Sequence, residues 1–330
     1  MRNAKVIDGA RVRRSGWSLG TTCPFSCRHC YTAASRQKSG ELTVEHINAV
    51  IGTFVALGVE SVVLGGNEPI YAGGADPRSS LLPFIITELL AEGIKPILIT
   101  SGLSARFLEM YSPDLFPLLA AVVLSLDSPV EDDHNASRGA PLFQIAQRAR
   151  DTCHEAGVPT LICVTPMKAN FTVDTLSGFV NLAEDWGSLL RMNTYKSSGG
   201  LADPQAVTLD QYWDGYRFLV ENCTTMLVDE PPLFPWFGRE AGPNCGSSSI
   251  RVGFPTKDGD IPVTPCQYRP EFASIGYGGP LPPADGRSRL CIDYSEYGEP
   301  PFTPASTRMG QSDVADLFDE YLCTWIGSPG

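Results

Sequence analysis

The stretch Trp17-Ser-Leu-Gly-Thr-Thr-Cys23-Pro-Phe-Ser-Cys27-Arg-His-Cys30 joins a short apolar run to three closely spaced cysteines. Residues 17–21 have the length and composition of a buried β-strand, and the cysteines follow almost at once. The chain has 10 Cys among 330 residues. Three of them at this fixed spacing would arise by chance on the order of one time in a hundred. The cluster of thiols therefore indicates a chemical requirement.

Apolar runs and amphipathic segments alternate from this stretch to about Asn193. The expected strands are residues 17–21, 61–64, 96–100, 121–126, 160–165 and 188–193, and the expected helices are residues 43–57, 81–91, 104–110, 141–155 and 173–186. The glycines that follow helices and precede strands are Gly58, Gly93, Gly157 and Gly187. Six β-then-α units of this kind predict a parallel α/β sheet, either open or curled into a partial barrel.

The alternation of strand-like and helix-like segments ends near residue 200. The polar, glycine-containing segment 197–205 reads as a linker, and one further helix is expected at residues 209–220. Two short β-prone runs, residues 250–254 and 261–264, flank Lys257-Asp-Gly-Asp260, which predicts a β-hairpin. We expect two domains, residues 1–200 and 201–330, the second small and built around this hairpin.

Composition and charge exclude several classes of protein. With 43% hydrophobic residues the chain can fill a sizeable core. The 25 Lys and Arg against 37 Asp and Glu give a net charge of −12, which opposes nonspecific binding to nucleic acid. No signal peptide is evident, and no segment approaches the about 18 apolar residues of a membrane span. We expect a cytoplasmic protein without nucleic-acid or membrane partners, whose clustered, reduced cysteines bind metal.

The cysteine triplet has three readings. A structural zinc site needs four ligands, usually in two close pairs, and His29 is the one nearby residue that could join Cys23, Cys27 and Cys30. Buried thiols without a metal are a second reading. In the third, the three thiolates hold three irons of a [4Fe–4S] cluster and leave the fourth iron open to a cofactor or substrate.

The triplet and its position resemble the radical S-adenosylmethionine superfamily, whose signature Cys-x3-Cys-x2-Cys follows the first strand of a partial (β/α)6 barrel. A second match is Gly65-Gly66-Asn67-Glu68-Pro69, which is similar to the family's Gly-Gly-Glu-Pro with one residue inserted. The resemblance covers about residues 15–200. It implies a [4Fe–4S] cluster, S-adenosylmethionine, and an external one-electron reductant such as flavodoxin or ferredoxin. It also implies a 5′-deoxyadenosyl radical that abstracts a hydrogen atom from a substrate.

The same resemblance implies how further residues contact S-adenosylmethionine. Glu68, or Asn67 in the other register, would accept the methionine ammonium group, and Arg138 or Arg191 would pair with its carboxylate. The weaker matches Thr100, Ser101, Ser125 and Asp127 complete the expected set, the last two toward the ribose and carboxylate. The alternatives are a simple glycine turn at residues 65–69 and ordinary ion pairs for the two arginines.

Four cysteines in the C-terminal part resemble the auxiliary-cluster domain of the SPASM and twitch subgroups. Cys245 and Cys266 flank the expected hairpin, and Cys291 and Cys323 remain to complete one four-thiolate cluster. The dense cysteine series of a full SPASM domain is absent from the sequence. We expect one auxiliary [4Fe–4S] cluster, with a zinc ribbon or scattered core cysteines as the alternatives.

Three cysteines are left over. Cys153, ahead of Gly157 on an expected helix, is expected in the core. Cys163 on the fifth expected strand and Cys223 after the last expected helix are candidate hydrogen-atom donors to a substrate radical, although packing in the core is the leading explanation for each.

Two kinds of substrate are compatible with these residues. The first is a small natural-product intermediate such as a sugar or aminocyclitol, which would be oxidised, with the auxiliary cluster accepting the second electron, or epimerised, with a cysteine donor. The second is a ribosomally made peptide that gains a crosslink or a D-residue. Only 22 residues precede Cys23, which favours the small molecule. A non-catalytic iron–sulfur or zinc protein is the third hypothesis.

Overall fold

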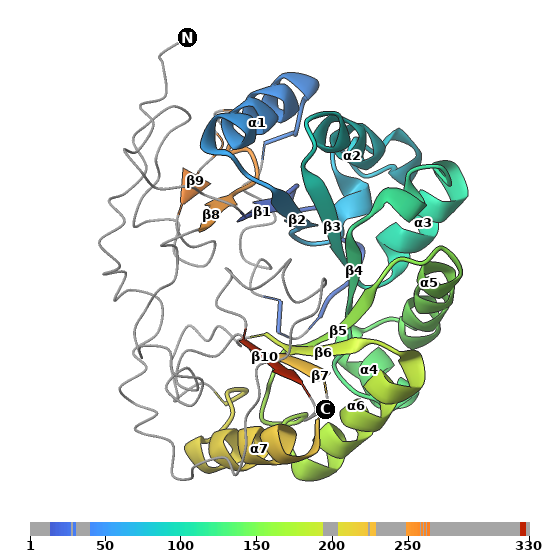
Figure 1. The fold of residues 1–330 in the computed structure, drawn as a ribbon, viewed down its shortest axis with the longest axis vertical. Coiled ribbons are helices and arrows are strands. Elements are labelled where there is room, and N and C mark those ends of the chain that lie inside the picture. Colours follow the sequence, from blue (N-terminus) through green and yellow to red (C-terminus); the bar gives the residue numbers. More distant parts are fainter. Residues whose placement is uncertain are drawn as a thin grey trace.

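The computed structural model describes residues 14–27, 29–30, 40–193, 204–223, 225–228, 249–257, 259, 261, 263–264 and 324–327. Within them one ten-stranded sheet runs in the order β10-β7-β6-β5-β4-β3-β2-β1-β8-β9. The strands β1 to β6 lie in chain order and pair in parallel, and the sheet curves without closing (Figure 1). The predicted partial (β/α)6 barrel is confirmed.

The six strands match the predicted apolar runs closely. They are β1 (Arg14–Ser18), β2 (Ser61–Gly65), β3 (Lys95–Thr100), β4 (Ala121–Ser125), β5 (Thr160–Val164) and β6 (Leu189–Met192). Only β1 is displaced, because it begins three residues before Trp17 and ends at Ser18. Residues 19–21, expected as strand, already belong to the loop that leads to the cysteines.

Helices cover the convex face of the sheet (Figure 1). They are α1 (Val44–Leu57), α2 (Leu82–Ala91), α3 (Leu103–Tyr111), α4 (Glu131–Arg138), α5 (Phe143–Glu155), α6 (Val173–Trp186) and α7 (Leu209–Asn222). Thr43 and Thr172 cap α1 and α6 with their side chains, and Gly58 and Gly187 end these helices in the left-handed conformation. These are the ends that the sequence predicts.

The helix α4 and the strand β7 (Thr225–Val228) are not among the predicted elements. The sequence of α4 is Glu-Asp-Asp-His-Asn-Ala-Ser-Arg, which has no apolar stripe, and its buried residues are the polar His134 and Arg138. Three acidic residues in its first turn and Arg138 in its last turn complement the helix dipole. Charge placement and two buried polar contacts, rather than apolar periodicity, therefore define this helix.

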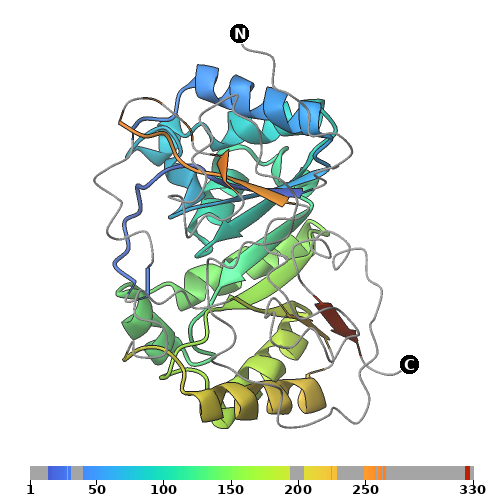
Figure 2. The same cartoon turned by 90° about the vertical axis from the view of Figure 1, so that its left-hand side faces the viewer.

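The two faces of the sheet carry separate apolar clusters. Val122 and Leu124 of β4 join the large cluster packed under the helices. Their neighbours Ala121 and Val123 join a smaller cluster with Ile97, Leu161 and Cys163 on the other, concave face. This alternation follows from the two-residue period of a strand, and it places Cys163 on the concave face. The helices lie on the other face of the sheet (Figure 2).

The C-terminal strands extend both ends of the same sheet. The predicted hairpin is confirmed by the antiparallel pair of β8 (Ser249–Val252) and β9 (Val263–Thr264), and β8 docks in parallel on β1. At the other end, β10 (Thr324–Gly327) pairs antiparallel with β7. The boundary near residue 200 stays a prediction, because much of the chain beyond it lies outside the described residues.

None of the helices in the described ranges is long and apolar enough to cross a membrane.

Candidate functional site

The candidate site lies where β1 to β5 end. Parallel strands bring their carboxyl ends to one edge of a sheet, and loops at that edge form the binding sites of α/β folds. The loop after β1 carries the cysteines, the loop after β2 carries Glu68, and the loop after β4 carries Asp127. The sequence predictions for these three loops therefore converge on one region.

The three cysteines share a short, partly buried loop. Cys23, Cys27 and Cys30 are reduced cysteines of intermediate exposure, and the backbone N–H of Cys30 donates to the carbonyl of Cys27 at 3.2 Å in a tight turn. Burial raises the pKa of the Cys27 thiol, an effect that the charge of Arg138 opposes. A bound metal would also favour the thiolate form.

The geometry of the loop bears on which metal group it fits. Among the described residues, no three His, Cys, Asp or Glu side chains converge on one possible metal position. A zinc ion would need thiolates at about 2.3 Å from a single centre, whereas cysteines that hold an iron–sulfur cluster bind different irons and lie farther apart. The loop offers three thiols, which is the number that a [4Fe–4S] cluster with one open iron needs and one fewer than a closed zinc site needs.

The Gly65–Asn67 turn packs directly against the end of β1. The carbonyl of Gly65 accepts from the N–H of Leu19 at 3.0 Å, and Asn67 Nδ2 donates to the carbonyl of Gly20 at 3.1 Å. Gly66 and Asn67 have φ of 80° and 54°, a conformation that glycine and asparagine adopt most readily. The residue inserted in this motif therefore serves a left-handed turn that abuts the cysteine loop.

The carboxylate of Glu68 is buried, with 3% of the residue exposed, and it receives five hydrogen bonds. Ser101 donates to Oε2 from its backbone N–H at 3.1 Å and from its hydroxyl at 2.8 Å. Oε1 accepts from the hydroxyl of Thr100 and from both the hydroxyl and the N–H of Ser104, the latter at 2.9 Å. These donors surround the start of α3, where a carboxylate is also favoured by the helix dipole.

This arrangement ties the predicted residues Glu68, Thr100 and Ser101 to one another. An ionised carboxylate offers about four lone-pair positions, and the five protein donors already occupy that capacity. Glu68 thus fastens the loop after β2 to α3. The predicted contact of Glu68 with the methionine ammonium remains a proposal, and it would have to share these oxygens.

Asp127 and Arg138 form a buried ion pair beside the cysteine loop. Arg138 Nη2 donates to Asp127 Oδ1 at 2.7 Å, and Arg138 Nη1 lies 3.9 Å from Cys27 Sγ as a long hydrogen bond to sulfur. The second oxygen of Asp127 accepts from the hydroxyl of Ser137 at 2.9 Å and lies 3.5 Å from His29 Nδ1. The carboxylate and the guanidinium, both predicted to contact S-adenosylmethionine, are thus engaged with each other.

The charge states of this pair follow from its surroundings. Burial alone would raise the pKa of Asp127, but the charges of Arg138 and His29 outweigh it and hold that pKa below its ordinary value. The pKa of Arg138 is raised, because Asp127 and Cys27 outweigh the effect of its burial. Both groups are therefore charged at neutral pH, and the ion pair is permanent under ordinary conditions.

Two further side chains fix the end of β4. The N–H of Asp127 donates to His134 Nδ1 at 3.1 Å, so that nitrogen carries no proton. Burial, followed by the charge of Arg138, lowers the pKa of His134 to about 4. Asn170 donates to the carbonyls of Asp127 and Thr165 at 3.0 and 3.1 Å and accepts from the N–H of Met167 at 2.7 Å. The loop after β5 is thereby joined to that after β4.

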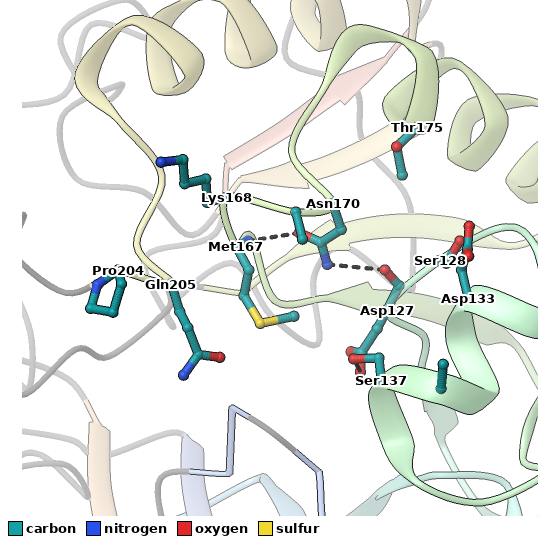
Figure 3. A pocket seen from close by; sticks show the side chains of 12 residues that line it. Asp127, Ser128, Asp133, Ser137, Met167, Lys168, Asn170, Thr175, Pro204 and Gln205 are labelled. Carbon is teal, nitrogen blue, oxygen red and sulfur yellow. Dashed lines mark hydrogen bonds between the residues drawn. The ribbon is translucent and has the colours of Figure 1, made fainter.

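A cavity of about 520 Å³ opens beside this junction. Figure 3 shows Asp127 and Ser137 on one side of it and Gln205 on the other, with Met167 between them. Its remaining lining includes Ser128, Asp133, Lys168 and Thr175. Cavities of about 300–1,000 Å³ are typical of small-molecule sites, and this one is predominantly lined by side chains that can hydrogen bond.

The structure separates the two candidate hydrogen donors. Cys163 lies in the concave-face cluster, and the strand register places it between Ser125 of β4 and Arg191 of β6. Cys223 follows α7 and packs in the cluster under the helices, as does Cys153. Cys163 therefore shares a face with the predicted site residues Ser125 and Arg191, whereas Cys223 does not. The predicted core position of Cys153 is confirmed.

The four candidate ligands of an auxiliary cluster, Cys245, Cys266, Cys291 and Cys323, lie outside the described residues. The auxiliary cluster stays a prediction from the sequence.

Several residues of this site are missing from the sequence prediction: Ser104, His134, Ser137 and Asn170. Each is a buried or partly buried polar group that holds Glu68 or Asp127. One sequence signal could have found His134, which precedes Arg138 by four residues, so that the two polar side chains share one face of a helix.

Comparison with known proteins connects this geometry to a family. The profile of the Radical SAM superfamily matches residues 17–176. Mycofactocin maturase MftC of Mycobacterium ulcerans is 28% identical over 193 residues, 57% of this chain and 48% of that protein. GTP 3′,8-cyclase of Mannheimia succiniciproducens is 31% identical over 229 residues, 68% of this chain and 64% of that protein. The chain thus spans about half the length of the maturase and somewhat more of the cyclase.

The fold is similar to that of a solved structure, native anSMEcpe with bound AdoMet. The TM-score is 0.54 at 18% sequence identity, and the match covers 77% of this chain and 74% of that chain. At this identity the likeness concerns the fold.

Proposed function

This chain belongs to the radical SAM superfamily, and we propose on that basis that it cleaves S-adenosylmethionine reductively at a [4Fe–4S] cluster held by Cys23, Cys27 and Cys30. It is therefore an enzyme. The observation that carries the proposal is the convergence of the cysteine loop, the Gly65–Asn67 turn and Asp127 at one edge of the sheet. When bound, the cluster and S-adenosylmethionine supply the electron transfer and the 5′-deoxyadenosyl radical.

The chain's own residues orient and enclose that chemistry. The Gly66 turn lies tightly against the end of β1, because a Cβ on Gly66 would be 2.7 Å from Ser18 Cβ, and this close packing holds the turn beside the cysteine loop. Asn67 lies half-buried on the same turn. If the motif is aligned in the other register, its side chain would bind the methionine ammonium group together with Glu68 or in its place. Arg138 and Arg191 remain the two candidates for the methionine carboxylate; Arg138 also pairs with Asp127, and Arg191 lies on the concave face of the sheet.

For the substrate we favour a small polar molecule, such as a sugar or aminocyclitol intermediate of natural-product biosynthesis. The cavity of about 520 Å³ beside Asp127, whose lining includes the hydrogen-bonding side chains of Ser128, Asp133 and Gln205, supports this choice. The similarity to GTP 3′,8-cyclase, named for a small-molecule substrate, is a second support. The alternative is maturation of a ribosomally made peptide, which the similarity to mycofactocin maturase favours.

The product depends on whether the substrate radical receives a hydrogen atom or loses an electron. Of the two candidate thiols, Cys163 is the one on the concave face, and it would complete an epimerisation by returning a hydrogen atom from the opposite side of the substrate. The thiyl radical left on Cys163 would then take one electron from the external reductant and one proton from solvent. An auxiliary cluster bound by the C-terminal cysteines would instead accept an electron and yield an oxidised product. The two outcomes require different residues and can be separated by mutation.

The proposed cleavage is tested with anaerobically reconstituted protein. We expect 5′-deoxyadenosine from S-adenosylmethionine under reductant, and close to eight irons per chain if both clusters form. Cys27→Ala should abolish 5′-deoxyadenosine, whereas Cys153→Ala, which removes a buried thiol far along α5, should retain it. Four irons per chain would remove the auxiliary cluster, and bound zinc without iron would overturn the proposal.

The substrate class is tested by supplying candidate substrates in deuterated water to the same preparation. A small polar substrate should suppress uncoupled cleavage and consume S-adenosylmethionine stoichiometrically. Deuterium incorporated at an inverted carbon, lost in Cys163→Ala, would establish epimerisation. Turnover of a precursor peptide, with none of any sugar or aminocyclitol, would establish the peptide alternative instead.

A further inference from the structure

Arg138 is held in a position that faces the cysteine loop. It leaves the last turn of α4, with 8% of the residue exposed. One nitrogen of its guanidinium donates to Asp127, and the other points at Cys27 Sγ. A planar guanidinium fixes both directions at once, so the contact with Asp127 determines where the second donor points.

The partner of Arg138 is itself immobilised from several sides. Asp127 is 2% exposed, its oxygens are engaged by Arg138 and Ser137, and its backbone bonds to His134 and Asn170. Turning Arg138 toward another ligand would leave a buried carboxylate without its counter-charge, which is costly. The guanidinium is therefore built into the wall behind the cysteine loop.

Thiolates that hold an iron–sulfur cluster respond to nearby charges and donors. Hydrogen bonds to the sulfurs and the charge around a cluster are among the determinants of its reduction potential. Adding an electron makes the cluster more negative, so a cation beside a ligating sulfur stabilises the reduced state more than the oxidised one. In this chain, Arg138 is a cation that contacts a predicted cluster ligand.

We infer that Arg138 is a positioning residue that raises the reduction potential of the cluster, and that Asp127 and Ser137 aim it at Cys27. This inference rests on the proposed function, because it requires a cluster on Cys23, Cys27 and Cys30. It gives Arg138 a role toward the protein's own cluster ligand in place of the methionine carboxylate contact expected from the sequence.

The test measures the midpoint potential of the reconstituted cluster by electron paramagnetic resonance during a redox titration, without S-adenosylmethionine. Arg138→Met removes the charge and the donor, and Arg138→Gln keeps a neutral donor. We expect the equilibrium constant for one-electron reduction to fall about tenfold in Arg138→Met, which is about 59 mV to more negative potential. Arg138→Gln should shift in the same direction by less.

Arg150→Met is the matched control. Arg150 is also a partly buried helical arginine with a carboxylate partner, Asp151, and it lies over the ring of Trp186 rather than near the cysteines. Its substitution should leave the midpoint potential unchanged. Iron content and the melting temperature of the apoprotein are measured for every variant, so that loss of folding is recognised separately.

Unchanged potentials in Arg138→Met and Arg138→Gln, with full iron content, would overturn the inference. So would loss of iron in both neutral variants with a wild-type apoprotein melting temperature, because Arg138 would then serve cluster assembly. If neither variant folds, Arg138→Lys decides. Lysine keeps the positive charge but lacks the planar guanidinium that contacts Asp127 and Cys27 at once. The midpoint potential of Arg138→Lys should therefore shift to a slightly more negative value, whereas an unchanged midpoint potential would overturn the inference. A wild-type chain that binds no cluster would instead refute the proposed function.

Discussion

Ser101 donates two hydrogen bonds to Glu68, from its backbone N–H and from its hydroxyl, and thereby ties the loop after β3 to the loop after β2. With the donors from Thr100 and Ser104, the carboxylate becomes an internal fastening between two loops of the site. Because the carboxylate is buried and accepts all five of these hydrogen bonds, replacing either of its oxygens by a donor should destabilise the connection between the two loops.

Glu68→Gln is expected to destabilise the apoprotein. The amide of glutamine places an NH2 group where an oxygen now accepts bonds, so at least one donor of Ser101 or Ser104 loses its acceptor. An unsatisfied buried donor costs about 1–3 kcal/mol, measured as the free energy of unfolding in urea. The exposed Glu92→Gln, just after α2, is the control and should have no effect. Unaltered stability with lost binding of S-adenosylmethionine would show instead that Glu68 serves the ligand alone.

Gly66→Ala is expected to disrupt the turn beside the cysteine loop. A Cβ there would lie 2.7 Å from Ser18 Cβ and 2.8 Å from Ser18 Cα, and φ is 80°. Relieving such a clash costs about 1–3 kcal/mol beyond the strain of a left-handed alanine. Gly157→Ala is matched, because its φ is 69° but its Cβ would meet nothing within 4 Å. Equal melting temperatures for the two variants would contradict the close packing of this turn on β1.

Much of this fold could be predicted from the sequence because apolar runs determine the strands. The six central strands and the helices α1, α2, α3, α5 and α6 lie where apolar periodicity and glycine ends predict them. The docking of β8 on β1 could not be predicted, since it pairs Arg14 with Ser249. Local sequence pattern carries no information on such distant pairing.

The sequence predicts several residues of the candidate site but not the hydrogen bonds and ion pairs that join them. Glu68, Thr100, Asp127 and Arg138 were each expected to contact the cofactor, whereas in the structure they contact one another. A polar residue at the end of a strand is equally compatible with a ligand contact and with a buried hydrogen bond. Only the three-dimensional arrangement, including His134 on a helix without an apolar face, distinguishes the two.

Acid should destabilise the apoprotein partly through His134. Its pKa is about 4 in the folded protein, against 6.5 for an unperturbed histidine. As the pH falls, the unfolded chain binds the proton before the folded protein does. Neutral His134 therefore costs no stability above pH 6.5, and the free energy of unfolding decreases as the pH drops from 6.5 toward about 4. The full loss is on the order of 3 kcal/mol.

The variant His134→Gln isolates this effect. Glutamine offers an amide oxygen that can accept the bond from the N–H of Asp127, and it does not titrate. We expect urea unfolding of the variant to depend less on pH between 6.5 and 4 than that of the wild type. The pKa of His29 is also lowered by burial, so a residual dependence should remain. Identical pH profiles would mean that His134 is not buried in its neutral form.

The cysteines should divide by reactivity in the apoprotein. Cys23, Cys27 and Cys30 are partly exposed, whereas Cys153 is fully buried and its burial raises its pKa to about 12. Since the thiolate is the reactive form, brief treatment with iodoacetamide at about pH 8 should label the loop cysteines and spare Cys153, with Cys27 labelled more slowly than its exposure alone suggests because burial raises its pKa. Cys163, 6% exposed, should also be spared. Mass spectrometry of peptides reads out each site.

Repeating the labelling after reconstitution tests the ligand sets directly. Cluster binding should protect Cys23, Cys27 and Cys30, and removing the iron with a chelator should restore their labelling. If the sequence prediction of an auxiliary cluster is right, Cys245, Cys266, Cys291 and Cys323 should gain protection together. Labelling of these four that does not change with iron loading, while the loop triplet becomes protected, would leave one cluster in the enzyme. Oxidation by transfer of a second electron to an auxiliary centre would then be excluded, and the thiol of Cys163 would become the principal candidate to quench the substrate radical.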